Sequence, residues 1–345
     1  MKKQTIFRHL TRITFIALSS TLFLSCSKLT DRLTDPGVSI ELAQFRKANY
    51  QNLHYKLHFN LPDSLNTQVT GTSCITVTLN QTEPLIIDFR ADSSQVHHVS
   101  LNDAPVPYTV EREHIIIPES AVQKGENQIQ IDFTANDQSL NRREEFLYTL
   151  LVPDRARTLF PCFDQPDMKA PFTLSLEAPA TWEAIANGAL MQTDTLPSGR
   201  KQFSFKETEP IPTYLFSFVG GRFEKVTETH NGRSVSLYHR ETDPQKKAQC
   251  HDILAQVFHS LDWLETYTGI PYPFTKYDLI IIPGFQYGGM EHMGATLYAD
   301  RSMFLERNAT LSSQLGRSSL IAHETAHMWF GDLVTMKWFD DVWTK

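Results

Sequence analysis

The chain has 345 residues, of which 41% are hydrophobic and 21% are charged, and its formal net charge is −7. This composition is typical of a globular chain that is long enough for two domains and a sizeable core. The acidic balance excludes the basic footprint of a nucleic-acid-binding protein, so we expect no nucleic acid among its partners.

Residues 1–26 differ from the rest of the chain. Lysines and arginines within residues 1–12 precede an uncharged apolar run, 13–24, which is short for a membrane span and typical of a secretory signal. The run ends in Phe-Leu-Ser-Cys, with a small residue before the single Cys26, and this resembles the bacterial lipoprotein signal. The resemblance implies an exported periplasmic or cell-envelope lipoprotein, which a lipid on Cys26 tethers to a membrane. An ordinary cleaved signal is the alternative.

Residues 27–45 contain Pro36 and Gly37 and show little periodicity, so we expect a linker there. The other cysteines are Cys74, Cys162 and Cys250. Their odd number and wide spacing argue against a disulfide framework, although one pair could be bridged.

Residues 46–226 show the alternation of polar and apolar residues that is typical of half-buried strands. Turn-forming residues separate the runs, as at 102–105. We therefore expect an antiparallel β-rich N-terminal domain of saddle or sandwich shape. The strand-like runs lie at 55–59, 74–79, 84–89, 128–133, 172–176 and 202–205.

A second domain is expected over residues 227–345. Apolar residues recur at helical spacing over 245–268, with Asp243 as a candidate N-cap and Gly269 as the end of the helix. An apolar run at 277–283 predicts a buried strand. Because a β-rich domain precedes a region with both helices and strands, we expect the whole chain to belong to the α+β class.

The strand is followed by a candidate binding loop, Gly288-Gly289-Met290-Glu291-His292. Glycines let a backbone approach a ligand closely, and a strand edge can pair with an extended peptide. The carboxylate of Glu291 can pair with an α-ammonium group. We interpret these five residues as substrate-binding residues for peptides with a free N-terminus, the alternative being a glycine turn with a solvated glutamate.

A helical H-E-x-x-H motif, His323 to His327, follows an apolar approach at 315–322. Histidines four residues apart leave the same face of a helix and can share one zinc ion. Glu324 lies beside the first ligand and can take a proton from a water that attacks a carbonyl. His323 and His327 are therefore candidate metal ligands and Glu324 is the candidate catalytic residue. A polar helix face is the alternative for the motif alone.

Three stretches together resemble the zinc aminopeptidases of the aminopeptidase N and leukotriene hydrolase family. They are the motif with its continuation through Met-Trp-Phe-Gly-Asp-Leu-Val-Thr (323–335), Trp-Phe-Asp-Asp-Val-Trp (338–343) and the Gly-Gly-Met-Glu-His loop. Phe-Pro-Cys-Phe-Asp-Gln-Pro (160–166) matches a further family motif, for which we expect a structural role. The resemblance implies a thermolysin-like metallopeptidase domain after the β domain, and a zinc-dependent aminopeptidase activity.

The resemblance also implies residues beyond the chain. The family's third zinc ligand is a glutamate whose position falls immediately after Lys345, and its oxyanion tyrosine lies further downstream. We therefore expect an incomplete catalytic domain, a site for one zinc ion that lacks a ligand, and no activity from the 345 residues alone.

Several positions depart from the family pattern or stay open. Leu150 stands where the family has a Gln or Glu in its first substrate pocket, which leaves side-chain preference and affinity in doubt. His292 stands where the family has Asn, a departure that can alter how Glu291 is held or the local charge at lower pH. Asp332, Asp340 and Asp341 are candidates to orient a zinc-bound histidine.

Three other functions compete with the aminopeptidase. An H-E-x-x-H endopeptidase would not need a free amine, and a non-catalytic binding or scaffold member of the same fold would carry no zinc. An epoxide hydrolase of the leukotriene type is the third, as a side activity.

Overall fold

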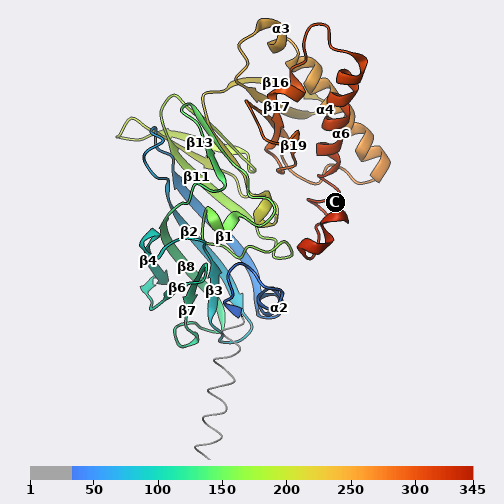
Figure 1. Cartoon of the computed structure of the whole chain (residues 1–345). Helices are drawn as coiled ribbons and strands as arrows, with labels where there is room; N and C mark the ends of the chain where they lie inside the picture. Colours follow the sequence, from blue (N-terminus) through green and yellow to red (C-terminus); the bar gives the residue numbers. More distant parts are fainter. Residues whose placement is uncertain (1–32, 345) are drawn as a thin grey trace, which may run out of the picture.

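The computed structural model describes residues 33–344. The predicted signal and Cys26 lie outside these residues. Figure 1 shows a β-rich N-terminal part, built from β1 to β15, and a second part in which helices accompany β16 to β20. Within the described residues, no helix combines the length and apolarity that crossing a membrane requires.

A helix replaces the end of the expected linker. Helix α2 (Ile40–Asn49) begins where the Ser39 hydroxyl accepts a hydrogen bond from the Leu42 amide at 3.1 Å. It is held to the domain by Arg46, whose guanidinium is fully buried and reaches both oxygens of Asp88 at 2.8 and 2.5 Å. The prediction of a linker over 27–45 is therefore wrong for residues 40–45. It missed the helix because a buried arginine fixes it, and arginine is a residue type that usually lies on the surface.

The largest sheet has eight strands in the order β13-β14-β11-β1-β2-β8-β4-β5. Its neighbours are antiparallel except β1 and β11, which run parallel with Tyr55 opposite Phe172, so the sheet is mixed rather than wholly antiparallel as expected. The strands are β1 (Tyr50–Asn60), β2 (Thr70–Leu79), β4 (Val96–Leu101), β5 (Ala104–Pro105), β8 (Gly125–Thr134), β11 (Phe172–Ala178), β13 (Leu190–Thr195) and β14 (Lys201–Phe205).

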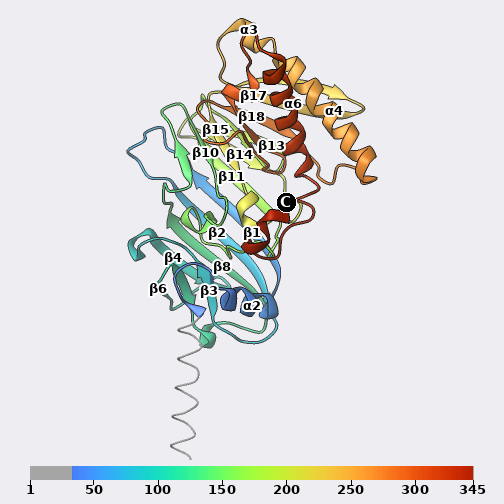
Figure 2. The same ribbon diagram turned by 45° about the vertical axis from the view of Figure 1, so that its right-hand side comes forward.

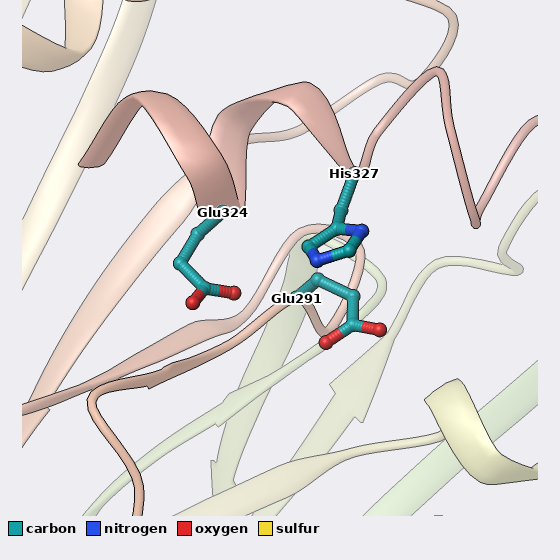
Figure 3. A group of neighbouring side chains, drawn as sticks. All are labelled: Glu291, Glu324 and His327. Atoms are coloured by element: carbon teal, nitrogen blue, oxygen red, sulfur yellow. The ribbon is translucent and has the colours of Figure 1, made fainter. Parts of the chain in front are cut away.

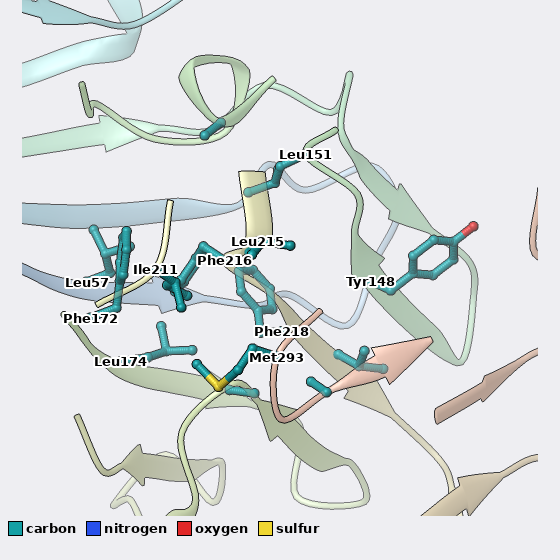
Figure 4. Close-up of a cluster of buried hydrophobic side chains, with 14 of the residues drawn as sticks. Leu57, Tyr148, Leu151, Phe172, Leu174, Ile211, Leu215, Phe216, Phe218 and Met293 are labelled. Carbon is teal, nitrogen blue, oxygen red and sulfur yellow. The ribbon is translucent and has the colours of Figure 1, made fainter. Parts of the chain in front are cut away.

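Two smaller sheets complete the N-terminal part. One has the order β12 (Glu183–Ala186), β15 (Phe218–Gly221), β10 (Phe146–Thr149) and β9 (Leu140–Arg142), and the other has the order β3 (Leu85–Asp88), β7 (His114–Ile117) and β6 (Thr109–Glu111). Their buried faces join the core of the large sheet, part of which Figure 4 shows. Short 3₁₀ turns connect the strands at Ser93–Gln95, Glu119–Ala121, Ala156–Thr158 and Thr213–Leu215.

The segment 160–166 has the structural position that we expect of it. Its middle is buried, and the amide of Asp164 donates to Asp88 Oδ2 at 2.7 Å. Asp164 in turn accepts from Thr213 Oγ1 at 2.7 Å. The segment therefore ties strand β3 to the 3₁₀ turn at 213–215 by buried polar contacts. Cys162 is buried, and Cys74, Cys162 and Cys250 are all free thiols.

The second part contains a five-stranded sheet in the order β16-β17-β18-β20-β19. Strand β16 begins at Glu224, so this part starts slightly before the expected boundary at 227. The strands are β16 (Glu224–His230), β17 (Arg233–His239), β18 (Asp278–Ile282), β19 (Gly289–Met290) and β20 (Thr296–Ala299).

Helices α4 (Cys250–Thr268) and α6 (Leu311–Ala326) pack together beside this sheet, as the two views in Figures 1 and 2 show. The expected helix over 245–268 is divided between α3 (Pro244–Lys247) and α4. Asp243 caps it by accepting from the Gln245 amide at 2.8 Å, and Gly269 ends it with φ of 67°. Helix α5 (Asp300–Met303) and the 3₁₀ turn Phe339–Thr344 complete the described elements.

Candidate active site

Helix α6 carries the H-E-x-x-H motif, as the sequence predicts. The Thr310 hydroxyl caps its start by accepting from the Ser313 amide at 3.2 Å. The helix ends at Ala326, yet His327 keeps helical angles (φ −57°, ψ −27°) and its amide donates to the His323 carbonyl at 3.2 Å. The two histidines therefore lie one turn apart on one face.

The imidazoles of His323 and His327 converge on one point. Their Nε2 atoms are 3.1 Å apart, and the rings are inclined at 80°. Two nitrogens that bind one tetrahedral zinc at about 2.0–2.1 Å lie about 3.3 Å from each other, so this separation fits a shared zinc ion. Partial desolvation and the neighbouring His327 lower the pKa of His323, although Glu291 opposes them. A lowered pKa favours the neutral imidazole, which is the form that binds metal.

The ring of His327 is oriented by the main chain. Its Nδ1 lies 3.1 Å from the carbonyl oxygen of Phe330, to which the Nδ1–H donates, and this leaves Nε2 with the lone pair that a metal needs. The turn is fixed because the Asp332 amide donates back to the His327 carbonyl at 3.0 Å. For His327, the orienting group is therefore this carbonyl rather than one of the three aspartates that we proposed from the sequence.

Glu324 lies against the candidate binding loop. Its side chain is 4% exposed. A Cβ atom at Gly289 would lie 2.4 Å from Glu324 Oε1, so the absence of a side chain at residue 289 lets the carboxylate occupy this place. The Thr325 and Tyr277 hydroxyls share a hydrogen bond at 3.0 Å, which fixes this turn of α6 to the residue just before β18. Tyr277 had no distinguishing signal in the sequence.

Glu291 completes the cluster. One ligand atom from each of Glu291, Glu324 and His327 lies within 4.8 Å of the other two. Figure 3 shows that the three side chains enter one space: Glu324 from helix α6, His327 from the end of that helix, and Glu291 from the chain after β19. Glu291 is 6% exposed. The cluster offers imidazole and carboxylate ligands, which suit zinc, and carboxylates that can also hold a proton or an ammonium group.

The loop before Glu291 forms the edge of the five-stranded sheet. Gly289 and Met290 pair with Tyr298 and Leu297 of β20, and the Gly288 carbonyl accepts from the Ala299 amide at 2.9 Å. Strand β19 is the last in the sheet order, and among the described residues no further strand pairs with its other edge. The substrate-binding role of Gly288, Gly289 and Met290 stays a prediction.

Two departures from the family pattern are buried. His292 is 0% exposed and follows the buried Glu291 directly in the chain. Leu150 is 2% exposed, and its amide donates to the Ser139 carbonyl at 2.9 Å. Leu150 therefore belongs to the core and offers no polar group to an amine.

Comparisons with known proteins agree with this geometry. The Peptidase M1 N-terminal domain matches residues 51–215, and the Peptidase family M1 domain matches residues 253–345. Human endoplasmic reticulum aminopeptidase 1 is 39% identical over 197 residues, which are 56% of this chain and 21% of that protein.

Two further relatives match over longer stretches of this chain at lower identity. Puromycin-sensitive aminopeptidase of Caenorhabditis elegans is 37% identical over 209 residues, or 59% of this chain and 22% of that protein. Probable aminopeptidase 1 of Sulfurisphaera tokodaii is 32% identical over 259 residues, or 75% of this chain and 32% of that protein. The matched part thus spans between a fifth and a third of these relatives. The two domain matches, in the order and at the places where the structure has its two parts, show that the chain belongs to peptidase family M1.

Proposed function

We propose that the complete protein is a zinc-dependent aminopeptidase that removes residues from the free N-terminus of peptides. The observation that carries this proposal is the convergence of Glu291 with Glu324 and His327, whose ligand atoms lie within 4.8 Å of one another. A carboxylate suited to an α-ammonium group thereby lies beside groups suited to hold a metal and to move a proton. The family match and the names of the relatives support the same activity.

In this proposal, His323 and His327 hold the zinc together with a carboxylate that lies after Lys345. Zinc, when bound, supplies Lewis-acid activation of a water and of the scissile carbonyl. Glu324 takes a proton from the water as its oxygen bonds to the carbonyl carbon. The same carboxyl group then gives that proton to the nitrogen as the C–N bond breaks, so Glu324 ends the reaction deprotonated.

Glu291 gives the enzyme its direction along the peptide. Its carboxylate binds the α-ammonium group of the first residue, and the open edge of β19 holds the backbone that follows. Because Glu291 lies next to Glu324, the bond placed at the proton-transferring carboxylate is the first one. A blocked N-terminus removes the charge that Glu291 recognises.

The test uses the complete protein. We expect about one bound zinc and hydrolysis of an aminoacyl-nitroanilide with a free amine, with little hydrolysis of its N-acetylated counterpart. Equal rates on the two substrates would favour the endopeptidase, and a preparation that binds no zinc would favour the non-catalytic binding or scaffold protein.

We also propose that the protein is exported and anchored to a membrane by a lipid on Cys26. This rests on the charged, apolar and small-residue pattern of residues 1–26. Cells grown with a labelled fatty acid should transfer label to the wild-type protein but not to Cys26→Ser. Label retained by the variant would contradict the anchor.

A further inference from the structure

Two side chains, one buried and one mostly buried, connect the N-terminal part to the loop that carries Glu291. Asn187 directly follows strand β12 and is 2% exposed. Lys276 precedes strand β18 in the second part, and its side chain is 13% exposed. They approach the same stretch of the loop, Met293 and Gly294, from opposite sides of the boundary between the two parts.

The side-chain amide of Asn187 binds the loop, and all of its hydrogen-bonding groups are engaged. Its Nδ2 donates to the Met293 carbonyl at 2.8 Å and to the Leu215 carbonyl at 2.9 Å. Its Oδ1 accepts from the Ser217 amide at 2.6 Å. Both N–H donors and the carbonyl are therefore engaged, and they tie the loop to main-chain atoms of the N-terminal part.

Lys276 makes the reciprocal connection. Its Nζ donates to the Gly294 carbonyl at 2.6 Å and to the Ala186 carbonyl at 2.7 Å, and it lies 3.2 Å from Asp278 Oδ2. The three N–H groups of the ammonium thus have three acceptors. One acceptor belongs to the loop and one to the residue immediately before Asn187, so the two side chains bind the same two segments.

The loop fits closely into this place. Gly294 has φ of +72°, and a Cβ atom there would lie 2.3 Å from the Asn187 carbonyl oxygen, so no other residue fits without a shift of the main chain. The side chain of Met293 is 1% exposed and lies among hydrophobic side chains of the N-terminal part, including Leu174, Phe216 and Phe218 (Figure 4).

We propose that Asn187 and Lys276 are positioning residues that set the place of the Glu291 carboxylate relative to Glu324. This inference rests on the proposed function, since it assigns to the N-terminal part the task of fixing the amine-recognising group. Glu291 precedes Met293 by two residues, so a loop released at Met293 and Gly294 lets Glu291 move while the metal-binding helix α6 stays in place.

The first experiment compares Asn187→Ala and Asn187→Asp with wild type in the complete protein. Asn187→Asp keeps the shape of the side chain and one acceptor but removes both donors. Because a lost buried hydrogen bond typically changes an equilibrium about tenfold, we expect KM for the free-amine nitroanilide to rise about tenfold. The preference over the N-acetylated substrate should fall by a similar factor, and zinc content should not change.

Asn127 provides a matched control. It is fully buried in the N-terminal part, donates to the Gln123 and Gly125 carbonyls at 2.7 and 3.0 Å, and accepts from the Gln123 amide at 3.1 Å. Asn127→Ala should lower the melting temperature as Asn187→Ala does but leave KM unchanged. If both variants change KM and substrate preference equally, Asn187 is merely structural and the proposal is overturned.

A second pair of variants, with a readout that needs no activity, separates this proposal from the proposed function. Lys276→Met removes the three donors, whereas Lys276→Arg keeps charge and donors and should restore much of the wild-type behaviour. Hydrogen exchange of the amides at 289–295 should be at least tenfold faster in Lys276→Met and Asn187→Ala than in wild type and Asn127→Ala. If the exchange rates do not change, the positioning role of Asn187 and Lys276 is overturned, whatever the activity. If the variants show this exchange pattern but the wild-type protein has no aminopeptidase activity, only the proposed function is overturned.

Discussion

Both parts of the molecule bury charged groups, but they combine them differently. In the N-terminal part, Asp88 accepts from both terminal nitrogens of Arg46 and lies 3.0 Å from His114 Nδ1, so unlike charges meet. In the second part, the carboxylates of Glu291 and Glu324 gather around His327. Matched charges give a fixed structure, whereas groups of like charge in one place are suited to bind something of opposite charge.

The matched charges of the N-terminal part change the pKa of Asp88. Burial alone would raise the pKa of its carboxyl, but Arg46 and His114 lower it to about 2. A carboxylate so held stays ionised down to about pH 2, and both of its oxygens are already engaged by Arg46, His114 and the Asp164 amide. The comparison predicts that changes in the first network alter stability and that changes in the second cluster alter chemistry.

The largest effect is expected from Glu324→Gln in the complete protein. The amide cannot take a proton from water, so kcat should fall about 10²- to 10⁴-fold while zinc content and melting temperature stay near those of wild type. Steady-state kinetics with metal analysis checks this. A variant that retains more than a tenth of wild-type kcat would remove Glu324 from the mechanism.

Asp88→Asn should instead unfold the protein more easily. It leaves the buried Arg46 without its counter-charge, for which we expect a loss of about 3–5 kcal/mol in the free energy of unfolding, measured by urea denaturation. Asp137→Asn is the control, because Asp137 is 56% exposed in its pair with Arg142 and should contribute less than about 1 kcal/mol. Equal losses in the two variants would show that burial does not distinguish these pairs.

Asp164 should make stability fall as pH rises. Burial raises the pKa of its carboxyl to about 6, against the opposing effects of Arg157 and Thr213. The folded state therefore binds this proton more tightly than the unfolded state, and the resulting stability is complete below about pH 4 and lost as pH rises through about 6. Asp88 acts oppositely, because its stabilisation is lost as pH falls from about 4 towards 2.

The check is to measure the free energy of unfolding between pH 4 and pH 7. Asp164→Asn should remove up to about 3 kcal/mol of the wild-type decline over this range, since one pKa unit corresponds to about 1.4 kcal/mol. A variant whose stability follows the wild-type curve in parallel would mean that the Asp164 carboxyl does not titrate there.

The smallest effect is expected at the start of α6. Thr310→Ala removes the hydroxyl that caps the helix, and about 1 kcal/mol of stability should be lost. Because the cap lies more than three helical turns before His323, zinc content and KM should not change. Thr310→Ser, which keeps the hydroxyl, should be close to wild type, and an equal loss in both variants would argue against the cap.

Local patterns in the sequence were sufficient for many of the strands and helices and for the shared face of His323 and His327. The alternation over 172–176 predicts strand β11 because side chains on a strand alternate between core and solvent. It does not predict the parallel pairing with β1, because that partner lies more than a hundred residues earlier and no local property records it. Helix α2 was missed because its fixing contact is a buried ion pair, which has no periodic signal.

The site shows the same limit. The spacing of His323 and His327 predicts their shared face, and the Nε2 distance of 3.1 Å confirms it. The nearness of Glu291 to the motif followed only from the family resemblance, since 31 residues lie between Glu291 and His323. The Phe330 carbonyl and Asn187 could not be found in this way, because every residue has a carbonyl and an asparagine in a loop is most often a turn residue.

The place of Met293 has a consequence for how such a protein can change over generations. Its side chain is 1% exposed and belongs to the core of the domain before it. A recombinant gene that joined this catalytic sequence to another N-terminal domain would keep the H-E-x-x-H motif. It would still lose the hydrophobic side chains of the N-terminal domain against which Met293 packs. The two domains are therefore expected to be inherited as a pair and to accept substitutions at their shared boundary only in concert.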